Sequence, residues 1–341
     1  MRKDQEVSDK YKKNQDFELA LSLMNKKLHE SEQELIAKLP ESYPTIHIIG
    51  APRSGTTLAV QQLAEGLKVG YINNLIAAFW KAPLFGIHLS KQLLKDEYHS
   101  SFKSTYGRTS GIQEPHEFGY FWNYHLKYDE FYQQDSNHEA KIDWDYLTTL
   151  IKNMCEVYDR PILFKSFLYG FHALKAQKIL QKTCFIYIRR DLMDNALSIL
   201  KMRKKYLGDS NEWASIKPKQ FDILQERNIY QQIIGQILFL EYEYINQLKE
   251  LPKKNRLIIN YEDMCDNPSE FINNVHSLLK PHYKGLKQSE ILSENEIQRK
   301  AYDDQGENVE NFEKAIKSLI HEFPKLKVLT EARKDKAQSI L

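Results

Sequence analysis

The chain carries the sequence TIHIIGAPRSGTT at residues 45–57, and this stretch decides the fold. Its first five residues are mostly β-branched and favour a short buried strand, which Gly50 ends in a tight turn. Residues 58–67 then continue as a helix. A strand, a glycine-bounded turn and a helix in this order let backbone N–H groups and the helix N-terminus converge on one phosphate. The stretch therefore predicts an anion-binding loop.

The two glycines of this loop, Gly50 and Gly55, have the spacing of a P-loop. Glycine there permits positive φ and close approach of the backbone to a ligand. Thr56 stands where a nucleoside triphosphatase needs its lysine, whereas Arg53 places a permanent, fork-shaped charge earlier in the loop. These two positions make ATP with magnesium a poor fit. A plain turn with a surface arginine is the alternative interpretation.

The same alternation of strand and helix recurs along the chain. Residues 161–164, 184–188 and 257–260 have the composition of further strands, and helices are expected at residues 171–182 and 221–250. Alternating strands and helices favour a parallel sheet with helices on its faces. We therefore expect an α/β fold with a central parallel sheet of about four to five strands.

The two ends of the chain look helical. Residues 1–40 show the apolar spacing of an amphipathic helix, which predicts a packing arm that could support a homodimer. From residue 268 onward the chain reads as helices with polar loops, and no repeat or flexible linker marks a boundary. We expect a helical arm at residues 1–40 and a single α/β domain at residues 41–341. The apolar positions of the arm are Leu21, Met24, Leu28, Leu35 and Leu39.

Charge and composition restrict the class of protein. The chain of 341 residues has 48 Lys and Arg against 46 Asp and Glu, so its net charge of +2 offers no strong field for nucleic acid or an anionic membrane. No stretch reaches the roughly 18 apolar residues needed to span a bilayer, and the first residues lack a signal peptide's apolar region. Three widely separated cysteines fit neither a disulfide framework nor a zinc site. We expect a cytoplasmic protein.

A second anion-binding motif is predicted at residues 186–191, which read IYIRRD and join a strand to a helix. Arg190 and Ser198 are separated by a little over two helical turns, so Ser198 lies near the face of the helix's first turn. A strand-end arginine and this serine could hold one phosphate together. A helix cap with solvated charges is the alternative interpretation for these residues alone.

Both motifs resemble those of the sulfotransferase family, in the variant whose PRSGTT loop, here residues 52–57, has arginine in place of the more usual lysine. The resemblance implies a P-loop-like three-layer α/β/α fold and 3'-phosphoadenosine 5'-phosphosulfate as donor. It also implies that Arg190 and Ser198 bind the 3'-phosphate, and that Tyr261, in the YED segment at residues 261–263, lies beside the adenine. The residues implied to bind the 5'-phosphosulfate are Gly50, Pro52, Arg53, Ser54, Gly55, Thr56 and Thr57.

The catalytic residues are less clearly marked. Lys165, at the end of a predicted strand, resembles the family's lysine that contacts the sulfonyl group, and Arg53 could stabilise the leaving oxygen. Enzymes of the family that act on phenols and steroids have a catalytic histidine two residues after that lysine, where this chain has Phe167. We expect the base within residues 113–122 instead, in the order Glu117, Glu114, His116.

The sequence thus predicts a sulfotransferase that acts on a hydroxyl or amine of an acceptor such as a sugar, a glycan or a small metabolite. The reaction is an in-line displacement that needs no metal. The acceptor would be chosen by aromatic-rich loops at residues 71–99 and 120–137, which do not identify it. A P-loop kinase of a small molecule and a non-catalytic nucleotide-binding protein are the alternatives.

Overall fold

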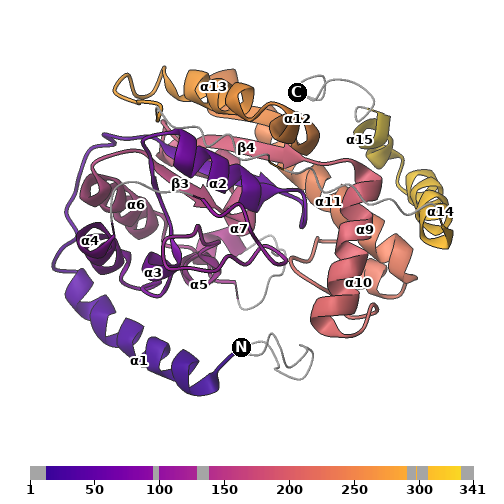
Figure 1. Ribbon diagram of the computed structural model, residues 1–341, viewed down its shortest axis with the longest axis horizontal. Coiled ribbons are helices and arrows are strands. Elements are labelled where there is room, and N and C mark those ends of the chain that lie inside the picture. Colours follow the sequence, from indigo (N-terminus) through magenta and orange to yellow (C-terminus); the bar gives the residue numbers. More distant parts are fainter. Residues whose placement is uncertain (1–12, 95–99, 129–137, 290–296, 298–305, 332–341) are drawn as a thin grey trace.

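A five-stranded parallel sheet forms the centre of the molecule (Figure 1). The structure is a computed structural model that describes residues 13–94, 100–128, 138–289, 297 and 306–331. The strands run in the order β2-β3-β1-β4-β5, so the predicted α/β class and the four predicted strands are confirmed. The two-residue strand β2 at the edge was not predicted. The strands are β1 (Thr45–Gly50), β2 (Gly70–Tyr71), β3 (Ile162–Lys165), β4 (Cys184–Arg189) and β5 (Arg256–Asn260).

The register of the sheet brings the predicted motifs to one edge. Ile48 of β1 pairs with Lys165 of β3, and Gly50 pairs with Ile188 of β4. Because carboxyl ends of parallel strands lie at the same edge, the loop after β1, the end of β3 and the turn after β4 are neighbours. Crevices at this edge are the usual ligand sites of open α/β sheets.

Helices cover both faces of the sheet, which gives the expected three layers (Figure 1). Ile46 and Ile48 of β1 face the smaller core, which α2, α12 and α13 complete, while Ile49 faces the larger core on the opposite side. The helices are α1 (Gln15–Glu32), α2 (Thr56–Gly66), α3 (Asn74–Ala77), α4 (Pro83–Leu93), α5 (Gly119–His125), η3 (His138–Lys141), α6 (Trp144–Tyr158), α7 (Phe167–Gly170), α8 (Ala173–Ile179), α9 (Leu192–Met202), η4 (Arg203–Leu207), α10 (Phe221–Gln225), α11 (Ile229–Lys249), η5 (Lys253–Asn255), α12 (Tyr261–Asp266), α13 (Pro268–Leu279), α14 (Glu307–Glu322), η6 (Pro324–Leu326) and α15 (Lys327–Glu331).

Among the described residues of the predicted N-terminal arm there is one helix, α1, and it ends at Glu32, before Leu35 and Leu39 of the apolar pattern. Residues 1–12 lie outside the described residues. Asn25 fastens α1 to the following helices: its side chain donates to Ala78 O at 2.7 Å and accepts from Lys81 N at 2.8 Å. Helix α1 is therefore packed against the segment between α3 and α4, while the division into an arm at residues 1–40 and a domain at residues 41–341, and the homodimer, stay predictions.

The single helix predicted over residues 221–250 is instead two helices, α10 and α11. Asn228 caps α11, because its side chain accepts a hydrogen bond from Gln231 N at 3.0 Å. Gly235 of α11 lets α10 fold back onto it, since a β-carbon at that position would collide with the Leu224 side chain. Among the described residues, no helix has the length and apolar character that crossing a membrane requires.

Candidate active site

The loop between β1 and α2 depends on its two glycines. Gly55 has φ of +100°, which glycine adopts without strain, and a β-carbon there would collide with the ring of Tyr261. A β-carbon on Gly50 would lie 2.5 Å from Ser54 Oγ and 2.7 Å from Ile188 O. The loop can therefore lie close to β4 and α12 only with glycine at both positions.

Three polar contacts tie this loop to the end of β4 and to α9. Arg190 Nη1 donates to Arg53 O at 3.1 Å, and Asn195 Nδ2 donates to Pro52 O at 2.7 Å. The side chain of Arg53 reaches Ser198, with Nε donating to Oγ at 3.3 Å. The two predicted anion-binding motifs, about 140 residues apart in sequence, thus form one polar site.

Tyr261 completes this side of the site. It opens α12 directly after β5, and its buried ring lies beneath the guanidinium group of Arg190, 4.6 Å from Cζ to the ring centroid. The neighbouring Arg189 belongs to the core, because its side chain pairs with the buried Glu241 of α11 at 3.5 Å. Of the two adjacent arginines, Arg190 is therefore the one that faces the loop.

Lys165 connects the loop to the candidate base. The lysine is buried, and its Nζ donates to Thr57 Oγ1 at 3.0 Å and pairs with Glu117 Oε2 at 3.1 Å. Nζ also lies 5.5 Å from the centroid of the Phe167 ring. Phe167 therefore makes a cation–π contact with the lysine. It occupies the position two residues after that lysine, where the enzymes acting on phenols and steroids have their histidine.

A model of the sulfotransferase family matches residues 44–283 of this chain. The chain belongs to the sulfotransferase family. No curated protein matches it. Similar solved structures include a sulfotransferase from Mycobacterium avium, with 12% identity, 89% of this chain and 73% of that chain covered, and a TM-score of 0.47. A sulfotransferase from Alicyclobacillus acidocaldarius shows 13% identity, with 84% and 95% covered and a TM-score of 0.40.

The three candidate bases of this sulfotransferase occupy different environments. Glu114 is buried and accepts hydrogen bonds from Gln61 Nε2 and from Ser101 N, both at 2.9 Å. Burial lowers the pKa of His116 to about 4, and its Nδ1 accepts a hydrogen bond from Phe118 N at 2.8 Å. The side chain of Glu117 is 31% exposed and contacts Lys165. The geometry favours Glu117, because its carboxylate pairs with the Lys165 ammonium group and is partly open to solvent.

Some residues of the site carry no signal in the sequence. Asn195 looks like an ordinary helical residue, yet its amide fixes the loop carbonyl of Pro52. The turn at residues 105–108 lies far from either motif in sequence, yet Gly107 approaches Lys165 and Thr57. A tyrosine–glycine pair is too common a turn signal to have identified it.

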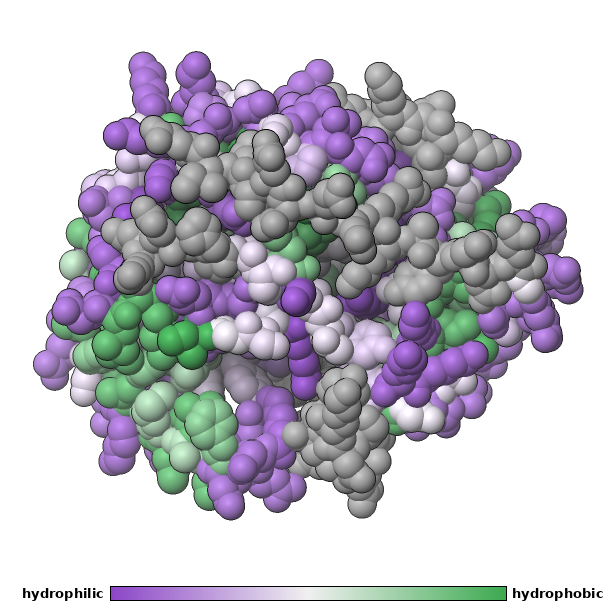
Figure 2. Space-filling view, viewed as in Figure 1, coloured by the Kyte–Doolittle hydropathy of each residue, from purple (hydrophilic) through white to green (hydrophobic). Residues whose placement is uncertain are grey.

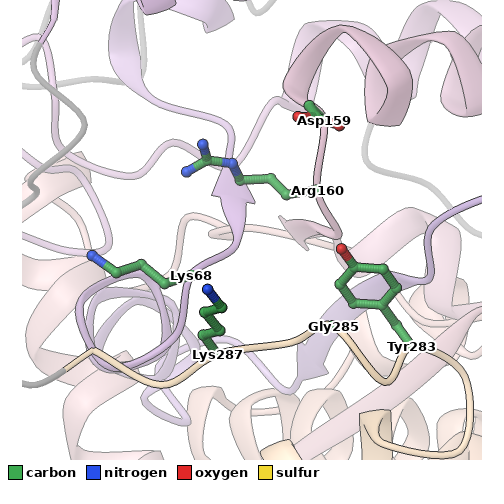
Figure 3. Close-up of a pocket in the computed structure, with 6 residues that line it drawn as sticks. All are labelled: Lys68, Asp159, Arg160, Tyr283, Gly285 and Lys287. Atoms are coloured by element: carbon green, nitrogen blue, oxygen red, sulfur yellow. The ribbon is translucent and has the colours of Figure 1, made fainter.

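A cavity of about 370 Å³ lies elsewhere in the sulfotransferase (Figure 3). Arg160 precedes β3 and so lies at the amino ends of the strands, whereas Lys165 lies at the carboxyl edge. The described residues contain no cluster of three or more His, Cys, Asp or Glu placed to hold a metal ion. The cavity is lined by Lys68, Asp159, Arg160, Tyr283, Gly285 and Lys287.

Proposed function

We propose that this transferase moves a sulfonyl group from 3'-phosphoadenosine 5'-phosphosulfate to a hydroxyl or amine of an acceptor such as a sugar or small metabolite. One observation carries the proposal: the Lys165 ammonium group contacts both Thr57 of the donor loop and the Glu117 carboxylate. The cation that would hold the sulfonyl group and the base that would accept the acceptor's proton are thereby adjacent. In-line displacement needs a base beside the attacking acceptor atom and a cation beside the group that is transferred.

The donor side of the site suits a molecule with two separate anionic groups. Ser54 Oγ is buried and has no hydrogen-bond partner among the described residues, so it can donate to a phosphate oxygen in the loop. Arg190 and Ser198 supply a permanent charge and a hydroxyl for the 3'-phosphate. The ring of Tyr261 offers an aromatic surface for the adenine.

The residues divide the chemistry between them. Glu117 takes the proton as the acceptor oxygen or nitrogen forms its bond to sulfur, and the bond from sulfur to the bridging oxygen breaks. Lys165 and Arg53 neutralise the charge that develops on the leaving oxygen, which departs with 3'-phosphoadenosine 5'-phosphate. Burial lowers the pKa of His116, and its Nδ1 already accepts a hydrogen bond from Phe118 N, so we assign the proton to Glu117 and not to this imidazole.

Residues 95–99 and 129–137 of the aromatic-rich acceptor loops lie outside the described residues, so the acceptor is proposed only as a hydroxyl or amine compound. All three cysteines are free and buried. Free thiols suit a reducing compartment, and we propose a cytoplasmic location on this ground.

Calorimetric titration with 3'-phosphoadenosine 5'-phosphate, and separately with ATP and magnesium, tests the donor. We expect tight binding of the bisphosphate and a loss of at least tenfold in affinity in Arg190→Ala, because a charge-assisted contact to phosphate contributes about 1.5–3 kcal/mol. Arg160→Ala is the matched control, since this arginine lies at the opposite end of the strands. Binding of ATP with magnesium alone would overturn the proposal in favour of a kinase.

A further inference from the structure

Gly107 lies against the part of the site where the transferred group would be held. A methyl group at this position would lie 3.5 Å from Lys165 Nζ and 3.7 Å from Thr57 Oγ1. It would also lie 3.8 Å from Arg53 Nη1. These three polar groups come from different elements and surround one point next to Gly107. Because residue 107 has no side chain, that point is left open.

The turn that carries Gly107 is held in place at its other side. Thr105 and Arg108 exchange backbone hydrogen bonds of 2.8 and 3.0 Å, which closes the turn. The guanidinium group of Arg108 donates to the hydroxyl of Tyr206 and lies 5.0 Å from that ring's centroid. The ring of Tyr106 contacts Tyr206 edge-on, with centroids 6.3 Å apart.

Tyr206 stands on η4, a five-residue π-helix that continues directly from α9. Helix α9 also carries Ser198, the partner of Arg53, so one continuous segment supports both the loop and the turn. Besides its contact with Ser198, Arg53 also contacts the turn, because its Cζ lies 5.6 Å from the centroid of the Tyr106 ring. The position of Gly107 is therefore fixed by the same elements that fix the donor loop.

A sulfonyl group has the size and charge for this space. Hydrogen bonds of roughly 2.7–3.2 Å to its oxygens would place its sulfur about 4 Å from each donor. The methyl position at residue 107 lies at a similar distance, 3.5–3.8 Å, from the same three donors. A side chain at residue 107 and a bound sulfonyl group would therefore compete for one volume. Without the ligand, an alanine methyl group would make only ordinary van der Waals contacts.

We propose that Gly107 is a positioning residue that leaves room for the sulfonyl group among Lys165, Thr57 and Arg53. This inference rests on the proposed donor. Two ligands then distinguish the effect of a side chain at residue 107: the phosphosulfate carries the sulfonyl group, and the bisphosphate product lacks it. A side chain there should weaken binding of the first ligand and leave binding of the second unchanged.

Gly107→Ala tests this by calorimetry with each ligand. We expect affinity for 3'-phosphoadenosine 5'-phosphosulfate to fall at least tenfold, while affinity for 3'-phosphoadenosine 5'-phosphate stays within about twofold of the wild-type value. Intact donor is verified by chromatography after each titration. A uniform structural defect would lower both affinities together.

Gly208→Ala is the matched control for backbone strain. Gly208 has φ of +81°, close to the +85° of Gly107, but a β-carbon there would meet nothing within 4 Å. We expect this variant to bind both ligands as the wild type does. The inference alone is overturned if Gly107→Ala changes the affinities for both ligands by the same factor relative to the wild type. It is also overturned if Gly208→Ala loses as much phosphosulfate affinity as Gly107→Ala. Failure of the wild type to bind either ligand overturns the proposed donor.

Discussion

Lys165 is the residue at which the two halves of the site meet. Its buried ammonium group contacts Thr57 of the proposed donor loop and Glu117, the proposed base, and lies near the ring of Phe167. A buried charge needs such partners, because an ammonium group without them loses its hydration uncompensated. The same partners prevent the side chain from leaving the site. Position 167 thus contacts the lysine, and the proposed base, Glu117, comes from the segment before α5.

Glu117→Gln tests the role of the carboxylate with little change in shape. We expect kcat to fall by about 100-fold or more, since general bases typically contribute factors of about 10²–10⁴. Bisphosphate affinity should not change, because Glu117 has no part in donor binding in the mechanism above. The rate is measured as release of 3'-phosphoadenosine 5'-phosphate with an acceptor found by screening.

Glu114→Gln is the comparison for this variant. Glu114 uses its two oxygens for Gln61 and Ser101 N, so we expect a lower melting temperature with less than a tenfold loss of kcat. Wild-type turnover in Glu117→Gln, or a larger loss in Glu114→Gln, would contradict the assignment of the base.

At the residue scale, the sequence could predict the groups that short motifs encode. The loop at residues 50–57 and the spacing of Arg190 and Ser198 follow from local rules for glycine turns and helix periodicity. Asn195 and Gly107 follow no such rule, because their importance arises from contacts with segments distant in sequence. The clustering of acids at residues 113–122 already placed Glu117 before Glu114, and the contact with Lys165 adds a geometric reason that the sequence could not supply.

At the scale of elements, α1 is joined to α4 by one buried acid. Glu32, at the end of α1, accepts a hydrogen bond from Leu84 N at 3.0 Å, in the first turn of α4. Burial raises the pKa of this carboxyl group to about 8, although backbone N–H groups of α4 act in the opposite direction. The protein therefore folds with a carboxyl group that it holds largely protonated at neutral pH.

Glu32→Gln should stabilise the protein at neutral pH. The folded pKa lies above the unfolded value of 4.5, so stability is greatest below pH 4.5 and is lost as pH rises towards 8. An amide keeps an acceptor for Leu84 N but does not titrate. We expect the free energy of unfolding at pH 7 to rise by roughly 2–3 kcal/mol, with little change near pH 4.5. Urea unfolding measures it, and a variant destabilised equally at both pH values would contradict it.

The elements themselves followed largely from the sequence. Each predicted strand has a run of apolar or β-branched residues that the buried sheet requires. The pattern failed at the break before Asn228, because α10 and α11 carry similar apolar residues and only the packing of Leu224 against Gly235 separates them. It also missed β2, since two residues are too few to show a period.

At the scale of the whole molecule, the sheet separates two cores, and the larger one contains several neutral histidines. His47 of β1 is fully buried, and its ring stacks with Phe164 and Phe185, with both centroid distances 5.1 Å. Burial lowers the pKa of His47, His125 and His172 to about 3 each. Hydrophobic patterning predicted the strand, but the aromatic rings around His47 come from the neighbouring strands β3 and β4 and from α7. Their contacts depend on the register of the sheet and on the packing of that helix.

These histidines should make the protein sensitive to acid. Their folded pKa values lie below the unfolded value of 6.5, so the unfolded chain binds more protons at pH values between about 3 and 6.5. Stability is fully present above pH 6.5 and falls with pH in this window, by about 1.4 kcal/mol per pH unit for each histidine. Carboxylates with raised pKa values, such as Glu32, act in the opposite direction below neutral pH.

His47→Leu isolates one of these contributions. Leucine has a similar volume, suits the surrounding rings and cannot take up a proton. We expect urea unfolding of the variant between pH 6.5 and 5 to show a slope smaller than that of the wild type by about 1.4 kcal/mol per pH unit. Stability at pH 7.5 should change little, because the histidine is neutral in both the folded and the unfolded chain there. Identical slopes in the two proteins would show that His47 is protonated in the folded chain, and that the core admits a charge between Phe164 and Phe185.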